Sequence, residues 1–384
     1  MFIIHGNIRT MEESDFEDGY LEIADGKIVA VGDMKDCPKT EGKVLDVQGS
    51  LVMPGIIEAH CHMGITEEKK GTEGDDCNEN VTPLTPWLRS IDAINPMDAA
   101  FKDALRAGIT SAMIGPGSAN VVGGQFAFVK THGRCIDNMI VKAPAAMKVA
   151  FGENPKVNYS GQGTSPSTRM AIAAMLREEL TKAVSYRKKR EENRDVETDF
   201  RYECWLPVLR REIPLKAHAH RADDILTAVR IAKEFGLRMT LDHCSEGHLV
   251  MEELKEAGFP AIVGPDMASR NKIEVQNMAF KTAGILSGYG ILTAITTDHP
   301  VSRIQFLPIC AGLAVKAGMT PEEGLRSITI NAAKICGVAD RVGSLLPGKD
   351  ADIAVFTGSP MEIFTETLYT LIDGKIVYAS QNQK

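Results

Sequence analysis

The apolar positions at both ends of the chain alternate with polar ones or form short runs that stop at glycines, a pattern typical of β-strands. Such segments occupy residues 2–10, 19–33, 42–55, 343–360 and 367–380. "ADGKIVAVG" at 24–32 is similar to "IDGKIVYAS" at 372–380, and the steps "ADGK" and "IHGN" (4–7) are hairpin signals. We therefore expect residues 1–53 and 345–384 to pair as one small β-sandwich domain. The alternative is two unrelated edge hairpins.

Between these ends, from residue 54 to 344, short apolar strands alternate with amphipathic helices. The segment 222–236, for example, has Ile225, Val229 and Ala232 on one helical face and a glycine at its end. This alternation predicts a parallel sheet wrapped by helices. The segment's length of about 290 residues favours an α/β fold of the (β/α)8 TIM-like barrel type, with a doubly wound open sheet as the competing architecture. Residues 166–200 are expected to form a long helix with a charged tail.

Composition narrows the class of protein. A formal charge of -8 argues against a nucleic-acid-binding protein. The sequence contains no run of roughly 18 apolar residues, so no membrane span is expected. Eight scattered cysteines without a C-x-x-C pair favour reduced thiols over a secreted disulfide framework, and the acidic start of the chain does not resemble a signal peptide. We expect a cytoplasmic protein.

Histidines and an aspartate stand where the apolar strands end. "VMPGIIEAHCHMG" (52–64) ends a strand with His60 and His62, which share one face because residues i and i+2 point to the same side. Later strands end at His218, His243 and Asp298. The carboxyl ends of barrel strands meet at one mouth, so these side chains are expected to converge on a metal ion.

Within this set the residue types suggest different roles. His218 is the expected ligand of the pair His218/His220, and His220 is expected to contact substrate or support a ligand. Asp298 is the expected catalytic carboxylate, able to orient a water molecule and carry its proton to the leaving group. The alternative for Asp298 is a helix N-cap before Pro300.

Two loops offer candidate substrate contacts. The glycine-rich stretch "GPGSANVVGGQFAF" (115–128) includes Gln125, whose amide could bind substrate, although a turn-rich connection without a ligand is the alternative. Arg270, in "DMASRN", could bind a substrate carboxylate, with an ordinary surface arginine as the alternative.

The order of these segments resembles the amidohydrolase superfamily of metal-dependent hydrolases over nearly the whole chain. "VMPGIIEAHCHMG" resembles the first barrel strand and "LRAGITSAMIGPG" the second; "KAHAH", "LDHC" and "TTDHP" resemble the fifth, sixth and eighth. "NAAKICGVADRVGSLLPGKDADIAVF" resembles the return into the β domain. Within the superfamily the sequence is similar to imidazolonepropionase-related proteins and to the Xaa-Pro and Xaa-Arg dipeptidase group.

This resemblance implies a metal site made of His60, His62, His218, His243 and Asp298. On the fourth strand, "AAMKVAFGENP" offers either Lys148, as a carboxylated lysine, or Glu153. The two are five residues apart and would face opposite sides of a regular strand. A divalent ion is implied, one or two per chain, with zinc the expected metal and iron or manganese as alternatives.

The expected activity is metal-dependent hydrolysis of an amide or cyclic amide C–N bond in a small molecule or dipeptide by activated water. The first alternative is a mononuclear aminohydrolase (deaminase) acting on a ring amidine, against which "HAHRADD" lacks the glutamate that such enzymes carry after the fifth-strand histidine. The second is a non-catalytic relative with the same fold. A small-molecule substrate and, by analogy with the family, a homo-oligomer are expected.

Overall fold

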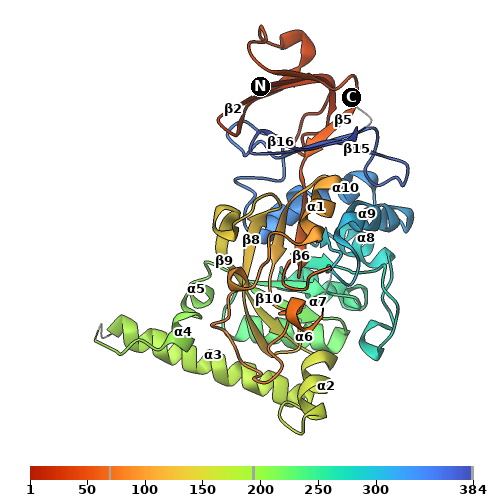
Figure 1. The fold of residues 1–384 in the computed structure, drawn as a ribbon. Coiled ribbons are helices and arrows are strands. Elements are labelled where there is room, and N and C mark those ends of the chain that lie inside the picture. The colour runs from red at the N-terminus through yellow and green to blue at the C-terminus, as the bar shows by residue number, and fades with distance from the viewer. Residues whose placement is uncertain (69–70, 193–194, 382–384) are drawn as a thin grey trace.

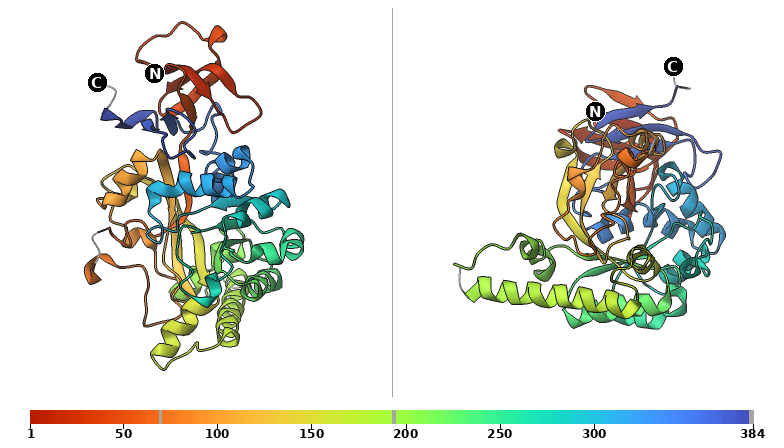
Figure 2. Two further views of the ribbon diagram at one scale, coloured as in Figure 1. Left: turned by 90° about the vertical axis from the view of Figure 1, so that its right-hand side faces the viewer. Right: turned by 60° about the horizontal axis from the view of Figure 1, so that its bottom comes forward.

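The computed structural model describes residues 1–68, 71–192 and 195–381 and contains two eight-stranded sheets. One sheet lies at one end of the molecule and carries both chain termini, and the other forms the body beneath it (Figures 1 and 2). In the terminal sheet the strand order is β16-β15-β14-β5-β1-β2-β3, with β4 paired to β1. Its strands are β1 (Phe2–Ile8), β2 (Phe16–Ala24), β3 (Lys27–Asp33), β4 (Val44–Asp46), β5 (Leu51–Pro54), β14 (Ile353–Phe356), β15 (Thr367–Ile372) and β16 (Lys375–Ala379).

The two chain ends join where β5 pairs antiparallel with β14. The predicted hairpin at "ADGK" is the β2–β3 turn, with φ of 50° and 77° at Asp25 and Gly26. The similar "IDGK" forms the β15–β16 turn, with φ of 49° and 70° at Asp373 and Gly374. Two successive positive φ angles are typical of the type I′ hairpin turn. "IHGN" forms no hairpin, so that prediction was wrong: it lies inside β1, where His5 has φ 55° and the register with β2 shifts.

The body is a nearly closed barrel with strand order β13-β12-β11-β10-β9-β8-β7-β6. Its two edges are bridged where the His62 N–H donates to the His299 carbonyl at 2.8 Å. The strands are β6 (Ile56–Cys61), β7 (Ile109–Ile114), β8 (Val122–Lys130), β9 (Ile140–Ala150), β10 (Leu215–Ala219), β11 (Met239–His243), β12 (Ala261–Val263) and β13 (Thr293–Ile295).

One strand departs from the expected all-parallel barrel, because β8 pairs antiparallel with both β7 and β9. Only residues 115–121 connect β7 to β8, and residues 131–139 connect β8 to β9. A parallel connection needs a crossover of about a dozen residues or more, so these short links favour hairpins. The remaining barrel neighbours from β9 to β13, and β6 with β7, are parallel.

Helices cover the outside of the barrel. They are α1 (Ala99–Arg106), α2 (Glu153–Gly161), α3 (Arg169–Glu192), α4 (Phe200–Glu203), α5 (Leu206–Leu209), α6 (Ala222–Glu234), α7 (Met251–Ala257), α8 (Lys281–Gly288), α9 (Leu307–Lys316), α10 (Pro321–Ser327) and α11 (Ile330–Cys336). The long helix expected in residues 166–200 is α3, which buries Ile172, Leu176, Leu180 and Ala183 along one stripe. It lies at the end of the barrel away from the terminal sheet and projects beyond the body (Figure 1). In the described part of the chain no helix is long and apolar enough to cross a membrane.

Two features fix the barrel beneath the histidines. A buried cluster that includes Ile57, Phe126 and Ile262 packs against α11. At the junction with the terminal sheet, the buried Lys130 ammonium contacts Asp350 at 2.9 Å and Asp352 at 2.5 Å. Lys130 ends β8 and the two aspartates precede β14, so this ion pair ties the barrel to the other sheet.

Candidate metal centre

Three histidines are oriented by hydrogen bonds at their Nδ1 atoms. His60 Nδ1 bonds the Asp242 carboxylate at 2.8 Å, His62 Nδ1 bonds the Gly115 carbonyl at 2.7 Å, and His243 Nδ1 bonds the Gly264 carbonyl at 2.8 Å. A carbonyl oxygen only accepts, so Nδ1 of His62 and of His243 must carry the proton. Their Nε2 atoms are thereby left as ligand atoms, the arrangement common behind metal-bound histidines.

The Nε2 atoms of His60 and His62 both approach Asp298. The Asp298 Oδ1 atom is 3.5 Å from His60 Nε2 and 3.1 Å from His62 Nε2. His60, His243 and Asp298 each have a ligand atom within 4.8 Å of the others. In a neutral His62, a lone pair would face a carboxylate at 3.1 Å, which is unfavourable unless a cation lies between them. A proton on His62 Nε2 can be that cation. Burial alone lowers the pKa of His62, but Cys77 and Asp298 raise it to about 10.

The backbone is strained at two residues of this group. His243 has φ 73° and Asp298 has φ 51°, both in the left-handed region that non-glycine residues rarely adopt. The Asp298 N–H donates to Thr296 Oγ1 at 2.9 Å, and that hydroxyl donates to the His60 carbonyl at 2.6 Å. These contacts hold the turn that aims the Asp298 carboxylate at the histidines. Strain of this kind persists only where surrounding contacts enforce it, and it is common at functional sites.

His218 and His220 differ in how their rings face His243. Atoms of all three imidazoles lie within 4.8 Å of one another. An imidazole lone pair lies in the ring plane, however, and the His220 ring stacks on that of His243 at an interplanar angle of 17°. Two stacked, nearly parallel planes do not meet at an ion, whereas the His218 ring is inclined by 68° to His243. The geometry therefore favours His218 over His220 as the ligand that would share an ion with His243.

On the fourth barrel segment the structure brings Lys148 to the histidines. Its buried ammonium is 3.4 Å from His60 Nε2, and burial lowers the pKa of Lys148 to about 8. Glu153 instead begins α2, where its backbone N–H donates to Glu274 Oε2 at 2.9 Å and its own carboxylate accepts from the Glu274 N–H at 3.4 Å. Of the two candidates, only Lys148 contacts a histidine of the group.

Gln125 and Arg270 are not brought to this group by the contacts that the structure describes. Gln125 Nε2 donates to the Pro86 carbonyl at 3.1 Å. The next residue of β8 is Phe126, whose ring centroid is 5.3 Å from that of His60. Because neighbouring residues of a strand point to opposite faces, Gln125 faces away from His60. Arg270 is exposed and donates to the Met278 carbonyl at 2.9 Å.

Sequence reasoning missed buried charges that support the centre. Asp242 is fully buried and also lies 3.2 Å from the Lys216 ammonium. Burial alone raises the pKa of Asp242, but Lys216 and His60 lower it well below its ordinary value. Glu58, also fully buried, accepts from the Thr297 hydroxyl and from the His60 N–H, and its Oε1 lies 2.6 Å from Thr296 Oγ1. Glu58 and Lys216 each stand two residues before a histidine in an apolar strand, a signal that could have found them.

A second missed group lies on the loop after β12 and at the start of α2. Glu274, in the short 3₁₀ turn η6 (Ile273–Val275), is buried, with Oε1 3.8 Å from His218 Nε2 and 3.9 Å from His220 Nε2. Asn154 Nδ2 is 3.4 Å from His218 Nε2, and the Lys272 ammonium contacts Asn154 Oδ1 at 2.6 Å. No periodicity in the sequence signals these loop residues.

The residues present fit a divalent cation. Asp298 Oδ1 and His218 Nδ1 are buried atoms that form no hydrogen bond with the described residues. Buried polar atoms normally have a partner, and a cation would provide one. Imidazole nitrogens with carboxylate oxygens are ligands typical of zinc, and His60, His62, His218, His243 and Asp298 would hold it.

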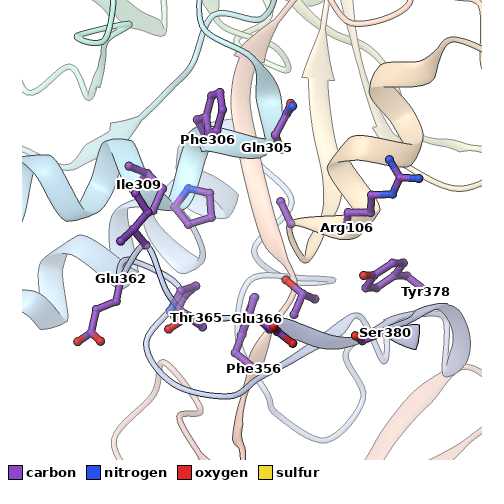
Figure 3. Close-up of a pocket in the computed structure, with 15 residues that line it drawn as sticks. Arg106, Gln305, Phe306, Ile309, Phe356, Glu362, Thr365, Glu366, Tyr378 and Ser380 are labelled. Atoms are coloured by element: carbon purple, nitrogen blue, oxygen red, sulfur yellow. The ribbon is translucent and has the colours of Figure 1, made fainter. Parts of the chain in front are cut away.

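A separate cavity of about 520 Å³ lies between the barrel and the terminal sheet, where Arg106, Phe306, Phe356 and Tyr378 are among the lining residues (Figure 3). Arg106 ends α1 shortly before β7 begins, so this cavity adjoins the amino end of that strand. The histidines lie at the carboxyl ends of the parallel strands, and none of them lines the cavity.

Comparisons with known proteins identify the family of this chain. The amidohydrolase family model matches residues 51–377. The crystal structure of an amidohydrolase from Thermotoga maritima MSB8 is similar with a TM-score of 0.95 at 38% identity, covering 99% of this chain and 100% of that one. Amidohydrolase tasK of Hapsidospora irregularis is 28% identical over 368 residues and covers 86% of this chain, which spans only 37% of that protein's length. Imidazolonepropionase of Sphingopyxis alaskensis is 23% identical over 402 residues, covering 94% of this chain and 92% of that protein. The chain belongs to the amidohydrolase family.

Proposed function

We propose that this protein hydrolyses an amide or cyclic amide C–N bond of a small molecule at a divalent metal ion held by His60, His62, His218, His243 and Asp298. The observation that carries the proposal is the approach of the His60 and His62 Nε2 atoms to within 3.5 Å and 3.1 Å of Asp298 Oδ1. Membership of the amidohydrolase family supports a hydrolase acting on C–N bonds.

A divalent ion held by these residues would polarise a carbonyl and lower the pKa of water toward about 7. Asp298 serves as the base that orients the attacking water and transfers its proton to the leaving nitrogen. Burial alone raises the pKa of Asp298, but His243, His62 and His60 lower it well below its ordinary value, so the carboxylate stays ionised near neutral pH. His220 lies next to His218 and His243, with its Nδ1 2.8 Å from the Ser245 hydroxyl. Its Nε2 can donate to the oxygen on which negative charge develops.

The site would take one or two ions depending on Lys148. A carboxylated Lys148 would add a carboxylate next to His60, and this additional ligand would allow the same residues to hold a second ion. Carboxylation needs the neutral amine, and a pKa of about 8 supplies it near neutral pH.

The first experiment is metal content per chain by plasma mass spectrometry, on protein purified without chelators and with bicarbonate present. Hydrolysis is then assayed on N-acyl amino acids, dipeptides, cyclic amides and ring amidines. We expect one or two ions per chain and release of an amine or a ring-opened acid. Asp298→Asn should lower turnover by about two orders of magnitude or more.

The outcomes are distinct. About two ions per chain, falling to one in Lys148→Ala but not in Glu153→Ala, would support the carboxylated lysine. Ammonia released from a ring amidine would instead identify an aminohydrolase. A protein that neither contains zinc nor takes it up would refute the proposed function.

A further inference from the structure

Lys272 inserts its ammonium between two elements that border the candidate metal centre. It precedes η6 on the loop after β12, and its side chain is 27% exposed. The ammonium contacts Asn154 Oδ1 at 2.6 Å and Glu274 Oε1 at 2.5 Å. Asn154 lies in the first turn of α2, so Lys272 links this helix to the loop after β12.

This ammonium is one side chain away from the imidazoles. Glu274 Oε1 is 3.8 Å from His218 Nε2 and 3.9 Å from His220 Nε2, and Asn154 Nδ2 is 3.4 Å from His218 Nε2. An ammonium has three donors; Lys272 donates one to Asn154 Oδ1, and Glu274 Oε1 is its ion-pair partner. The third N–H is available to a group that enters from the exposed side of Lys272.

The residues that hold Lys272 are themselves fixed. Glu274 is 1% exposed, and its Oε2 accepts the Glu153 N–H at 2.9 Å. Asn154 Nδ2 donates to Ser118 Oγ at 2.7 Å. Gly152 permits this close packing, because a Cβ at that position would lie 2.9 Å from Glu274 Oε2. The ammonium is thus held in place before any ligand binds, which lowers the entropic cost of recognition.

We propose that Lys272, positioned by Asn154 and Glu274, binds a carboxylate of the substrate. The inference rests on the proposed function, since it names the substrate class of the same site: amides that also carry a free carboxylate, such as N-acyl amino acids or dipeptides. A carboxylate accepts a charge-assisted hydrogen bond from an ammonium more strongly than a neutral carbonyl does. Of Lys272 and Arg270, only Lys272 contacts residues that border His218 and His220, whereas Arg270 donates to the Met278 carbonyl.

The test uses probes that bind the metal independently of catalysis. These are the monohydroxamates of malonate, succinate and glutarate, each paired with its monomethyl ester, and calorimetry on the zinc-loaded protein measures their dissociation constants. The hydroxamate group reports on the metal, and the affinity ratio of acid to ester reports on the carboxylate. The three chain lengths cover different distances between the metal and Lys272.

Two substitutions should change that ratio in opposite directions. Lys272→Met removes the donor and should lower the acid-to-ester ratio by about tenfold or more. Glu274→Gln removes the negative charge next to the ammonium and should raise the ratio. A purely structural role would not produce opposite signs. Lys281→Met, at an exposed lysine that begins α8, is the matched control and should leave the ratio unchanged.

Each result decides the question. If all three acids bind no better than their esters, or if Lys272→Met leaves the ratio within twofold, the proposal is wrong. Loss of the preference in Arg270→Met but not in Lys272→Met would assign the carboxylate to Arg270 instead. Ester binding that disappears when zinc is removed shows that the metal centre is intact, so failure of the carboxylate site is distinguishable from failure of the proposed function.

Discussion

Asp242 offers the sharpest test of how the metal centre is built. Its fully buried carboxylate bonds His60 Nδ1 at 2.8 Å and Thr240 Oγ1 at 2.8 Å, and it lies 3.2 Å from the Lys216 ammonium. Asp242→Asn keeps the shape of the side chain and removes its charge. The substitution should therefore weaken two functions, the orientation of His60 and the neutralisation of Lys216.

The expected magnitudes follow from these contacts. Loss of a carboxylate behind a metal-bound histidine typically costs about 10- to 100-fold in metal affinity, or roughly 1.4 to 2.7 kcal/mol. Lys216, 1% exposed, would lose its only described carboxylate partner and keep the Ala59 carbonyl at 3.1 Å. Breaking a buried ion pair on one side costs about 3 to 5 kcal/mol, and the retained carbonyl contact favours the lower end.

Zinc affinity is measured by competition with a chromophoric chelator, and the free energy of unfolding by urea denaturation of the metal-free protein. Asp98→Asn is the control. Asp98, which directly precedes α1, is also buried, but its carboxylate accepts from the Glu68 N–H and contacts no histidine of the group in the described structure. The control should leave zinc affinity unchanged. A zinc affinity of Asp242→Asn within twofold of the unsubstituted protein would refute the claim that Asp242 orients a metal ligand.

Three further outcomes follow from particular residues. Burial lowers the pKa of Lys148 to about 8, so the fraction of neutral amine rises as the pH passes through that value. Carboxylation of the metal-free protein by ¹³C-bicarbonate, measured by NMR, should therefore increase from about pH 7 to 9. The signal should be absent in Lys148→Met. Lys130→Met removes the ammonium between Asp350 and Asp352 and should lower the free energy of unfolding by about 3 kcal/mol or more, measured in urea; a change below about 1 kcal/mol would contradict the structural role given to this junction. In Gly152→Ala the new residue would have φ 83° and its Cβ would lie 2.9 Å from two carboxylate oxygens, whereas in Gly163→Ala it would have φ 71° and its Cβ would meet open space. Thermal unfolding should show the larger loss of stability, above about 1 kcal/mol, for Gly152→Ala. Equal losses of stability would mean that only the backbone angle matters.

The sequence alone determined the features that depend on local periodicity and residue type. Apolar residues at every second position predicted the strands of the two chain ends, and apolar residues at helical spacing predicted the helices of the barrel. Burial of one face of a strand or helix imposes these periods. The Asp-Gly step at 25–26 predicted a hairpin turn, since those residues tolerate positive φ. Histidines at strand ends predicted a shared site at one mouth, and the structure brings His60, His62, His243 and Asp298 together there.

The tertiary structure decided what depends on side-chain direction and on the path of loops. The reversed direction of β8 follows from connections too short for a crossover, which the alternation of apolar segments does not reveal. Lys148 rather than Glu153 meets His60, because the chain leaves the strand at Gly152 and turns into a helix. Whether His218 or His220 can share an ion with His243 depends on ring planes, which no spacing encodes. Lys272 rather than Arg270 contacts the residues that border His218 and His220, because the loop after β12 packs against α2, a contact between segments more than a hundred residues apart in sequence.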